Sequence, residues 1–402
     1  MEKLVPKLRF PEFEGNWIAN KLGNFAEVSK LAGYEFTKHV IYEDYGKIIA
    51  LRGLNIKNNS LLLNDVKYID NSELNKLERS KLYIDDMMFT YIGTIGEVAL
   101  IEENDRFYLA PNVSRIRFNR NEVIPKFILQ YFTRDNFKEK VIKGYITSSS
   151  QPALTMENVR KFEIKFPSLQ EQQKIATFLT SVDERLTLLA QQKEKLELYK
   201  KGVMQQIFPS TSSGQAPKLR FKDENGNNYP DWEEKKLGEI AKITIGEFII
   251  KTKQNPNSPY PVFNGGKSYT GFYDDYNNEG NKIIISARGA NAGFVNFYKE
   301  KYWAGNSCYS VSFKAIDNYF IEYFFYYVKF FENRFTDFQQ AANIPSVSKK
   351  DVENFKIDVP CLEEQQKIAS FLSAIDVQIE GVSNKIEQTK LFKKGLLQQM
   401  FV

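Results

Sequence analysis

Histidine and cysteine are scarce in this chain of 402 residues. His39 is the single histidine, and Cys308 and Cys361 are the two cysteines. Structural zinc sites take four ligands, mostly cysteine and histidine, so these counts exclude a zinc cluster and disfavour a histidine-based catalytic triad. Two cysteines in a chain of this length fit a reducing compartment, and we expect the protein in the cytoplasm.

Long apolar runs and a large charge imbalance are also missing. No stretch approaches the ~18 apolar residues of a membrane-spanning helix. The first residues, MEKLVPKLRF, lack the apolar core of a secretion signal, so we expect no membrane partner. The net charge is only +5, from 55 Lys and Arg against 50 Asp and Glu. This excess permits nucleic-acid binding but does not argue for it.

The chain is rich in internal repetition, which sets the organisation before any local assignment. EQQKIA occurs at 171–176 and 364–369, and KKGVMQQIF at 200–208 returns as KKGLLQQMF at 393–401. YLAPNVSRIRF (108–118) resembles YWAGNSCYSVSF (302–313), which places Asn112 opposite Asn306. Two further pairs match: KLRFPEF (7–13) with KLRFKDE (218–224), and SSSQPALTMENVRKFEIKFP (148–167) with AANIPSVSKKDVENFKIDVP (341–360).

The repetition divides the chain into two variable blocks and two helices. We expect domains at 1–168 and 218–361, long helices at 169–208 and 362–402, and a flexible linker at 209–217. Each domain should hold a mixed sheet plus helices, so the fold class is α+β with two pseudo-symmetric domains. Residue patterns predict strands at 47–52, 65–69, 86–92, 97–102, 114–118, 282–288, 293–298 and 308–314, and helices at 125–142 and near 318–333.

Both long segments carry an apolar seam with the 4-3 spacing of a coiled coil. The two seams share one register, so we expect the helices to pair with each other, antiparallel if a pseudo-two-fold axis relates the repeats. Each helix would span roughly 55 Å at the α-helical rise. Periodicity alone also fits a dimerisation device. The seam residues are Ile175, Leu179, Val182, Leu186, Leu189 and Leu196, and Ile368, Leu372, Ile375, Ile379, Val382 and Ile386.

Two similar but non-identical domains on such a spacer predict a reader of two DNA sites. B-DNA repeats every ~34 Å, so a spacer of this length suits two grooves about one turn apart. The blocks differ in their loops, so the two half-sites should differ and the whole site should be asymmetric. The matched helix ends indicate a surface that binds the same partner twice.

The chain resembles specificity subunits of type I restriction–modification systems over essentially its whole length. The resemblance rests on LRFPEFEGNW and KLG at the block starts, on FPSLQEQQKIATFL and VPCLEEQQKIASFL at the helix starts, on the helix ends 200–208 and 393–401, and on the tandem order. It implies two target recognition domains that read a split sequence in double-stranded DNA, with helices that set the gap between the half-sites.

The resemblance also implies partners. Two modification (methyltransferase) subunits would dock on the helices, and up to two restriction (motor-nuclease) subunits would complete the restriction enzyme. The chemistry would belong to those partners, so S-adenosylmethionine, ATP and magnesium are expected on them and no cofactor on this chain. The chain itself would be non-catalytic.

The residues themselves also lack a convincing catalytic motif. GKS at 266–268 has Pro261 where a phosphate loop needs its first glycine. NPNSPY (255–260) departs from a methylase motif by the spacing of its prolines, and FEIKFP (162–167) lacks the aspartate that a nuclease would need. The aromatic run at 319–331 could stack bases, but aromatics on all sides favour a buried helix.

Bases are read by Arg, Asn, Gln and Lys on loops, and phosphates are held by Lys, Arg, Ser, Thr and backbone N–H groups. Glycine-bounded loops at matching repeat positions, such as YIGTIG (91–96) and ARGANAG (287–293), allow close approach to DNA. Arg115 and Arg117 alternate on one strand and are expected at phosphates. The other candidates are Arg52, Tyr91, Thr94, Asn112, Ser149, Ser150 and Gln151 in the first block, and Asn264, Lys267, Arg288, Asn291, Asn306, Gln340 and Asn343 in the second.

Two other classes of protein stay open at this point. A coiled-coil scaffold that joins protein partners without binding DNA is supported by the small net charge. A self-sufficient methylase or nuclease is disfavoured by the missing motifs. DNA affinity that falls steeply with salt separates a DNA reader from a scaffold.

Overall fold

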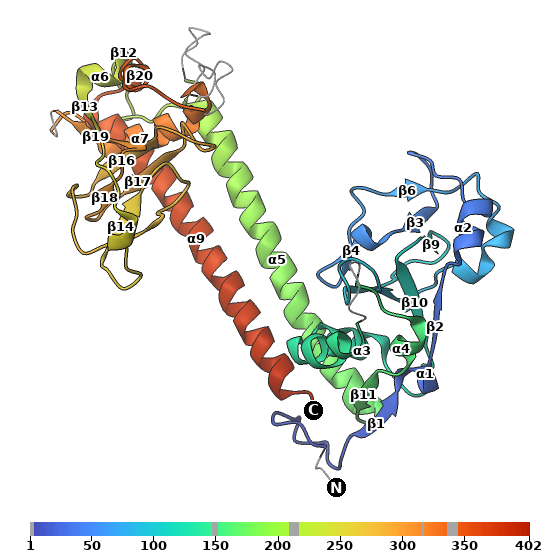
Figure 1. Cartoon of the computed structure of the whole chain (residues 1–402). Coiled ribbons are helices and arrows are strands. Elements are labelled where there is room, and N and C mark those ends of the chain that lie inside the picture. Colours follow the sequence, from blue (N-terminus) through green and yellow to red (C-terminus); the bar gives the residue numbers. More distant parts are fainter. Residues whose placement is uncertain (1–3, 147–151, 209–216, 315–316, 336–344) are drawn as a thin grey trace. The chain divides into compact units, whose positions relative to one another are not determined.

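The computed structural model describes residues 4–146, 152–208, 217–314, 317–335 and 345–402. The chain forms two compact units. Unit 1 takes the chain up to Ala190 together with Asn384–Val402, and unit 2 takes Gln191–Ser383. Two long helices, α5 (Leu169–Ile207) and α9 (Leu362–Gln399), each contribute one half to each unit (Figure 1). Each unit therefore combines an α+β domain with parts of both helices.

The domain of unit 1 is built on a four-stranded antiparallel sheet and a smaller mixed sheet. The four-stranded order is β2 (Ala26–Lys30), β10 (Val113–Phe118), β7 (Met87–Thr90), β8 (Val98–Leu100). The three-stranded order is β6 (Lys67–Tyr68), β3 (Ile49–Leu51), β9 (Phe107–Leu109), with β3 and β9 parallel. The pairs β1 (Ile18–Lys21) with β11 (Glu163–Phe166) and β4 (Ile56–Lys57) with β5 (Ser60–Leu61) complete it. Its helices are α1 (Leu22–Phe25), α2 (Gly33–His39), α3 (Pro125–Thr133) and α4 (Met156–Arg160).

Unit 2 repeats the two sheets and the terminal strand pair of this plan, and its described residues hold no counterpart of the β4–β5 pair or of α2. Its four-stranded sheet runs β13 (Ala241–Ile245), β19 (Cys308–Phe313), β16 (Lys282–Ser286), β17 (Val295–Tyr298). Its three-stranded sheet runs β15 (Gly271–Tyr273), β14 (Tyr260–Phe263), β18 (Trp303–Ala304), again with one parallel pair, and β12 (Glu233–Lys236) pairs with β20 (Lys356–Val359). The helices are α6 (Leu237–Ile240), α7 (Ile321–Phe330) and α8 (Lys349–Glu353). The expected pseudo-symmetric α+β fold is confirmed.

The first predicted core helix is shorter than expected, while the second is where the sequence placed it. The range 125–142 is not one helix, because the backbone becomes extended at Arg134 after α3 and continues as a π-helical turn, Phe137–Ile142. The Arg134 guanidinium is buried over the rings of Tyr131 and Phe401, at 3.9 and 4.9 Å from their centroids. In α7, Tyr323, Phe324 and Tyr327 are fully buried, which confirms a core helix over a base-stacking platform.

The repeated motifs fasten each domain to its helix by the same contacts. Arg9 of the LRF segment forms a two-point ion pair with buried Glu171, at 2.9 and 2.7 Å, and Arg220 binds buried Glu364 at 3.1 and 2.7 Å. These glutamates are the first residues of the two EQQKIA copies. Paired, hydrogen-bonded charges are the form in which buried ions are tolerated.

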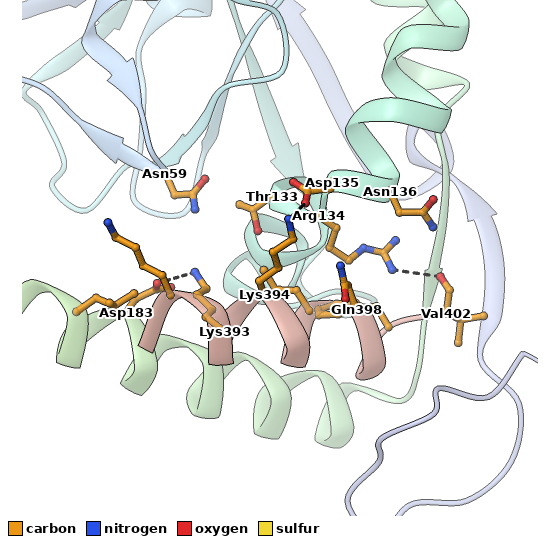
Figure 2. Close-up of a pocket in the computed structure, with 14 residues that line it drawn as sticks. Asn59, Thr133, Arg134, Asp135, Asn136, Asp183, Lys393, Lys394, Gln398 and Val402 are labelled. Carbon is orange, nitrogen blue, oxygen red and sulfur yellow. Dashed lines mark hydrogen bonds and ion pairs between the residues drawn. The ribbon is translucent and has the colours of Figure 1, made fainter. Parts of the chain in front are cut away.

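The end of each helix returns to the other helix's first half, within one unit. In unit 1, Lys393 Nζ lies 2.5 Å from Asp183 Oδ1 (Figure 2). Leu8 N donates to the carbonyl of Gln399, while its neighbour Arg9 binds Glu171. Residue numbers rise along α9 as they fall along α5, so the two segments run antiparallel. Unit 2 shows the same arrangement, with Lys200 Nζ 2.5 Å from Asp376 Oδ1.

The predicted seam residues lie on the inner side of both helices. Ile175, Leu179 and Val182 belong to the core of unit 1, and Ile368, Leu372 and Ile375 to the core of unit 2. The early part of each seam therefore packs on its own domain. Leu189 and Val382 are also buried, and Leu186, Leu196, Ile379 and Ile386 are half-buried.

Candidate nucleic-acid interface

Three loops of unit 1 meet around a hollow of about 400 Å³. They follow β3, connect β7 to β8, and connect β9 to β10. Three of the predicted DNA-binding residues, Arg52, Thr94 and Asn112, line the hollow from these three loops. The sequence predicted these residues one by one, and the fold brings them together.

Backbone geometry shapes these loops. Gly93 and Gly96 have φ of +79° and +90°, a region that side chains rarely adopt, so glycine lets the β7–β8 loop turn sharply. Asn112 has φ of +72°, which asparagine tolerates better than most residues. Its carbonyl accepts from Tyr91 N at 3.3 Å, which ties two of the loops together. The Asn112 side chain is left exposed.

Arg52 is held in place from one side. Its Nη2 donates to the carbonyl and to Oδ1 of Asp65, both at 2.8 Å. Fully buried Asn55 organises the loop between them, because its Nδ2 donates to the carbonyls of Leu62 and Asp65 and its Oδ1 accepts from Arg52 N. Since Nη2 is occupied, Nε and Nη1 are the guanidinium nitrogens for which the described residues show no acceptor, and Nε is buried. Pre-positioned donors of this kind lose less entropy on binding.

Unit 2 brings the same three loops together. A Cβ added to Gly265 would lie 2.9 Å from the Arg288 carbonyl and 3.2 Å from Ser307 Cβ, so the loops after β14, between β16 and β17, and between β18 and β19 are in contact. Asn264 Oδ1 accepts from Ser307 N at 3.1 Å. Arg288 is exposed. The matching positions thus present different side chains in the two units.

Comparison with known proteins agrees with this duplicated architecture. The family model for the type I restriction modification DNA specificity domain matches residues 14–198 and 229–390. The chain belongs to this family. It is 29% identical over 362 residues to the putative type I restriction enzyme MjaX specificity subunit of Methanocaldococcus jannaschii, covering 85% of this chain and 83% of that protein.

A solved structure shares the fold. The type I restriction-modification S subunit from M. genitalium aligns with a TM-score of 0.67 and 17% identity, over 99% of each chain. Because the family model matches both halves of the sequence, this chain is a type I specificity subunit with DNA-recognition domains. Proteins of this class are generally non-catalytic. The described parts of the chain contain no group of three or more His, Cys, Asp or Glu suited to a metal ion, and no helix long and apolar enough to cross a membrane.

The register of the repeat differs by one residue from the sequence match in this specificity subunit. Val113 pairs with Thr90 in unit 1, and Cys308 pairs with Ser286 in unit 2. In each unit, the carbonyl of the preceding residue (Asn112 or Ser307) accepts a hydrogen bond from the backbone N–H that follows the partner strand residue, which is Tyr91 or Ala287. Asn112 is therefore equivalent to Ser307, and the expectation that it matches Asn306 is wrong. The sequence match was shifted because YLA (108–110) and YWA (302–304) look alike. In the sheets, Tyr108 pairs with Ala50 and Trp303 pairs with Val262, so Tyr108 is equivalent to Trp303 and not to Tyr302.

Three candidates of the first domain have partners inside the protein. Tyr91 is buried, which raises the pKa of its phenol. Arg115 is 4% exposed and its Nη2 binds Glu27 at 2.6 Å, while Arg117 makes a two-point ion pair with buried Asp86 at 2.7 Å. These ion pairs give both arginines a structural role within the protein. Their contact with phosphate stays a prediction.

Some of the remaining candidates lie on the described loops of unit 2, and the others lie outside the described residues. Lys267 is exposed, 5.9 Å from the centroid of the Phe294 ring. Asn291 and Asn306 are half-buried on two of the converging loops. The other candidates, Ser149, Ser150, Gln151, Gln340 and Asn343, lie outside the described residues.

Among the residues that line the hollow of unit 1, Tyr42 and Leu54 are large side chains that sequence reasoning missed. Both are exposed. Partial removal of the phenol from water raises the pKa of Tyr42, although 38% of this residue is still exposed, and the positive charge of Arg52 opposes that shift. For Leu54, the signal in the sequence was its place directly after Gly53. Tyr42 reaches the site only through the tertiary fold, so no local pattern could have identified it.

Proposed function

We propose that this chain reads a two-part, asymmetric DNA sequence, with one half-site for each unit. The observation that supports this most strongly is the pair of three-loop clusters. The structural equivalence places Arg52 of unit 1 opposite Asn264, and Ile92 opposite Arg288. Because arginine and asparagine prefer guanine and adenine edges respectively, different side chains at matching positions select different bases.

Membership of this family also supports a set of protein partners for the chain. Two modification subunits dock on the helix segments that the two units share, and they carry the methyl-transfer chemistry on adenine with S-adenosylmethionine. Restriction subunits join them with ATP and magnesium. This chain supplies sequence recognition and assembly. The duplicated contacts at Glu171 and Glu364 support two equivalent docking positions, since each helix begins in the same environment.

The proposal is tested by mapping adenine methylation across the source genome with and without this gene. Loss of one split motif, with two unlike half-sites around a fixed gap, is the expected result. In parallel, the affinity of the purified assembly for that motif should fall steeply as salt rises, because lysine and arginine displace counterions from the phosphates. An unchanged methylome in cells that express the partner subunits would favour the scaffold alternative.

Arg288→Ala separates the two half-sites. We expect about 1–3 kcal/mol less discrimination at one position of the second half-site, because one base-reading side chain is removed. Asn112→Gly is the reciprocal variant: it keeps the left-handed backbone and should relax the first half-site only. Binding to a library of randomised sites measures both. Unchanged preferences at every position in the Arg288 variant would contradict the assignment.

A further inference from the structure

The segment that follows β13 in unit 2 exposes a phenylalanine. Phe248 is 74% exposed, whereas every other phenylalanine of unit 2 that the structure describes is buried or half-buried. Leaving such a side chain in water forgoes the free energy that its burial would contribute to folding. The packing of the chain therefore does not explain the position of this ring.

The backbone before Phe248 is fixed. Glu247 N donates to the carbonyl of Ala304 at 2.8 Å. Gly246 approaches the same strand end so closely that an added Cβ would lie 2.3 Å from the carbonyl oxygens of Ala304 and Gly305. Glycine is required here, because the side chain of any other residue would clash with that backbone.

The backbone after Phe248 is fixed as well. Ile249 is 8% exposed and packs in a small core with Tyr273. Ile250 N donates to Tyr273 Oη at 2.6 Å, and Tyr273 Oη donates to the carbonyl of Ile250 at 2.9 Å. Phe248 thus projects from a loop that is held on both sides. A group that is already positioned loses less conformational entropy when it binds a partner.

The loop of Phe248 touches the candidate DNA-binding surface. A Cβ added to Gly305 would lie 2.4 Å from Asn264 Oδ1 and 2.5 Å from Ile249 Cδ1. Gly305 belongs to the loop between β18 and β19, and Asn264 follows β14. Two of the three converging loops therefore meet the neighbour of Phe248. The segment 246–250 is a fourth contributor to this surface.

Two lysines follow Phe248 on the same segment. Lys251 and Lys253 are exposed, and the described part of the chain gives neither of them an acidic partner. Glu247 is the one acidic residue between 246 and 254. Lysine is depleted in protein–protein interfaces, whereas phosphate oxygens are commonly bound by it. An exposed aromatic ring beside unpaired lysines thus fits DNA better than a protein surface.

Unit 1 also exposes an aromatic ring in the matching segment. β2 and β13 are equivalent strands, and Tyr34, which is 66% exposed, lies on α2 shortly after β2. The local structures differ, because the described residues of unit 2 have a 3₁₀ turn, Lys251–Lys253, in place of α2. An exposed aromatic ring therefore recurs in both units, although the residues around it do not.

We propose that Phe248 inserts into the base stack of the second half-site and unstacks one base-pair step, while Lys251 and Lys253 bind the adjacent phosphates. This deepens the proposed function and rests on it. Methylation of adenine requires that base to leave the duplex stack, which costs stacking energy. A ring that stacks on the bases left behind offsets part of this cost, and apolar wedges of this kind kink the duplex.

Fluorescence of 2-aminopurine tests the insertion, because the emission of this base analogue rises when it is unstacked. The analogue is placed in turn at each position of the second half-site and its flanks, in duplexes that carry the split motif. With the chain assembled on its modification subunits, we expect one position besides the methylated adenine to brighten. Phe248→Ala should leave that position dark and weaken binding about 10-fold. Phe248→Trp should restore both, because tryptophan also stacks on bases.

Two control variants on the same segment separate stacking from charge. Glu247→Ala removes an exposed side chain next to Phe248 and should leave the bright position unchanged. Lys251→Ala should lower the slope of log affinity against log salt by about 1, whereas Phe248→Ala should keep the slope. All three side chains are exposed, so the melting temperature should not change.

The opposite results overturn the proposal in distinguishable ways. A second half-site that stays stacked in the unaltered assembly, or equal emission and affinity for Phe248→Ala, would refute the insertion while leaving the proposed function intact. No binding of the unaltered assembly to the split motif would refute the proposed function as well. Loss of modification subunits from Phe248→Ala, seen by native mass spectrometry, would assign the ring to a protein contact instead.

Discussion

At the scale of residues, one buried amide in each unit makes three hydrogen bonds that connect two segments of backbone. Gln365 Oε1 accepts from Phe320 N at 2.8 Å, and its Nε2 donates to the carbonyls of Pro360 and Asn318 at 2.8 and 3.3 Å. Gln172 makes the equivalent three bonds in unit 1. The second residue of EQQKIA therefore joins the start of the long helix to the start of the core helix.

Gln365→Ala should lower the free energy of unfolding of unit 2 by about 2–3 kcal/mol, because buried backbone groups lose their partners. Hydrogen exchange of α7 in urea reports this change locally. The neighbouring Gln366 is exposed, so Gln366→Ala serves as the control and should change the value by less than about 0.5 kcal/mol. Equal effects of the two substitutions would show that the amide bonds contribute nothing.

At the scale of elements, the KLG motif brings two short helices into close contact. A Cβ on Gly23 of α1 would lie 2.9 Å from Arg160 Cβ at the end of α4, and a Cβ on Gly238 of α6 would lie 2.9 Å from Glu353 Cβ at the end of α8. Leu22 N and Leu237 N donate to the carbonyls of Phe162 and Phe355, which fixes both helix pairs. Glycine is required here by a neighbour.

Gly23→Ala should destabilise unit 1 by about 1–3 kcal/mol, since the added methyl group forces α1 and α4 apart. Gly144→Ala provides the comparison in the same unit: its added Cβ meets no atom within 4 Å, and its effect should be small. Urea unfolding followed by hydrogen exchange of β2 measures both variants. A tolerated Gly23→Ala would mean that the two helices can shift without loss.

Elements with a strong local signal could be predicted from the sequence. The apolar seams and the prolines before them predicted α5 and α9. Glycine and asparagine residues at the strand ends predicted β7, β8 and β10. The parallel pairing of β3 with β9 could not be predicted from the sequence, because its partners, such as Ile49 and Phe107, are 58 residues apart and meet only in the folded core. At the site, single loop residues were identifiable from their type. Their convergence, and the internal ion pairs of Arg115 and Arg117, depend on the tertiary fold.

At the scale of the whole molecule, unit 1 is discontinuous in sequence, whereas unit 2 is the single stretch Gln191–Ser383 and includes the second half of α5. Phe401 packs against Trp17, Phe127 and Tyr131 in the core of unit 1, with ring centroids 5.2–6.0 Å apart. Phe208 packs against Tyr323 and Tyr327 in unit 2, at 5.9 and 5.3 Å. Each domain is therefore completed by the end of the helix that starts on the other domain.

Phe401→Ala should cost unit 1 about 3–5 kcal/mol, although the nearest parts of that domain's sequence are more than 200 residues away. Hydrogen exchange should accelerate in β7 and β10 and stay unchanged in β16 and β19. Phe208→Ala is the mirror variant and should show the reverse pattern. Faster exchange in both units for either substitution would mean that their cores are coupled.

The discontinuity of unit 1 changes the order of events during protein synthesis. Domains generally fold from the N-terminus as the ribosome releases them. Here all residues of unit 2 have been made once Ser383 is joined, whereas unit 1 still lacks Leu396, Met400 and Phe401 from its core. Trp17, Phe127 and Tyr131 therefore lack their contacts with Phe401 throughout translation of the second domain. The domain that is translated first is thus the last to finish folding, and it is the one that depends on protection from aggregation in the meantime.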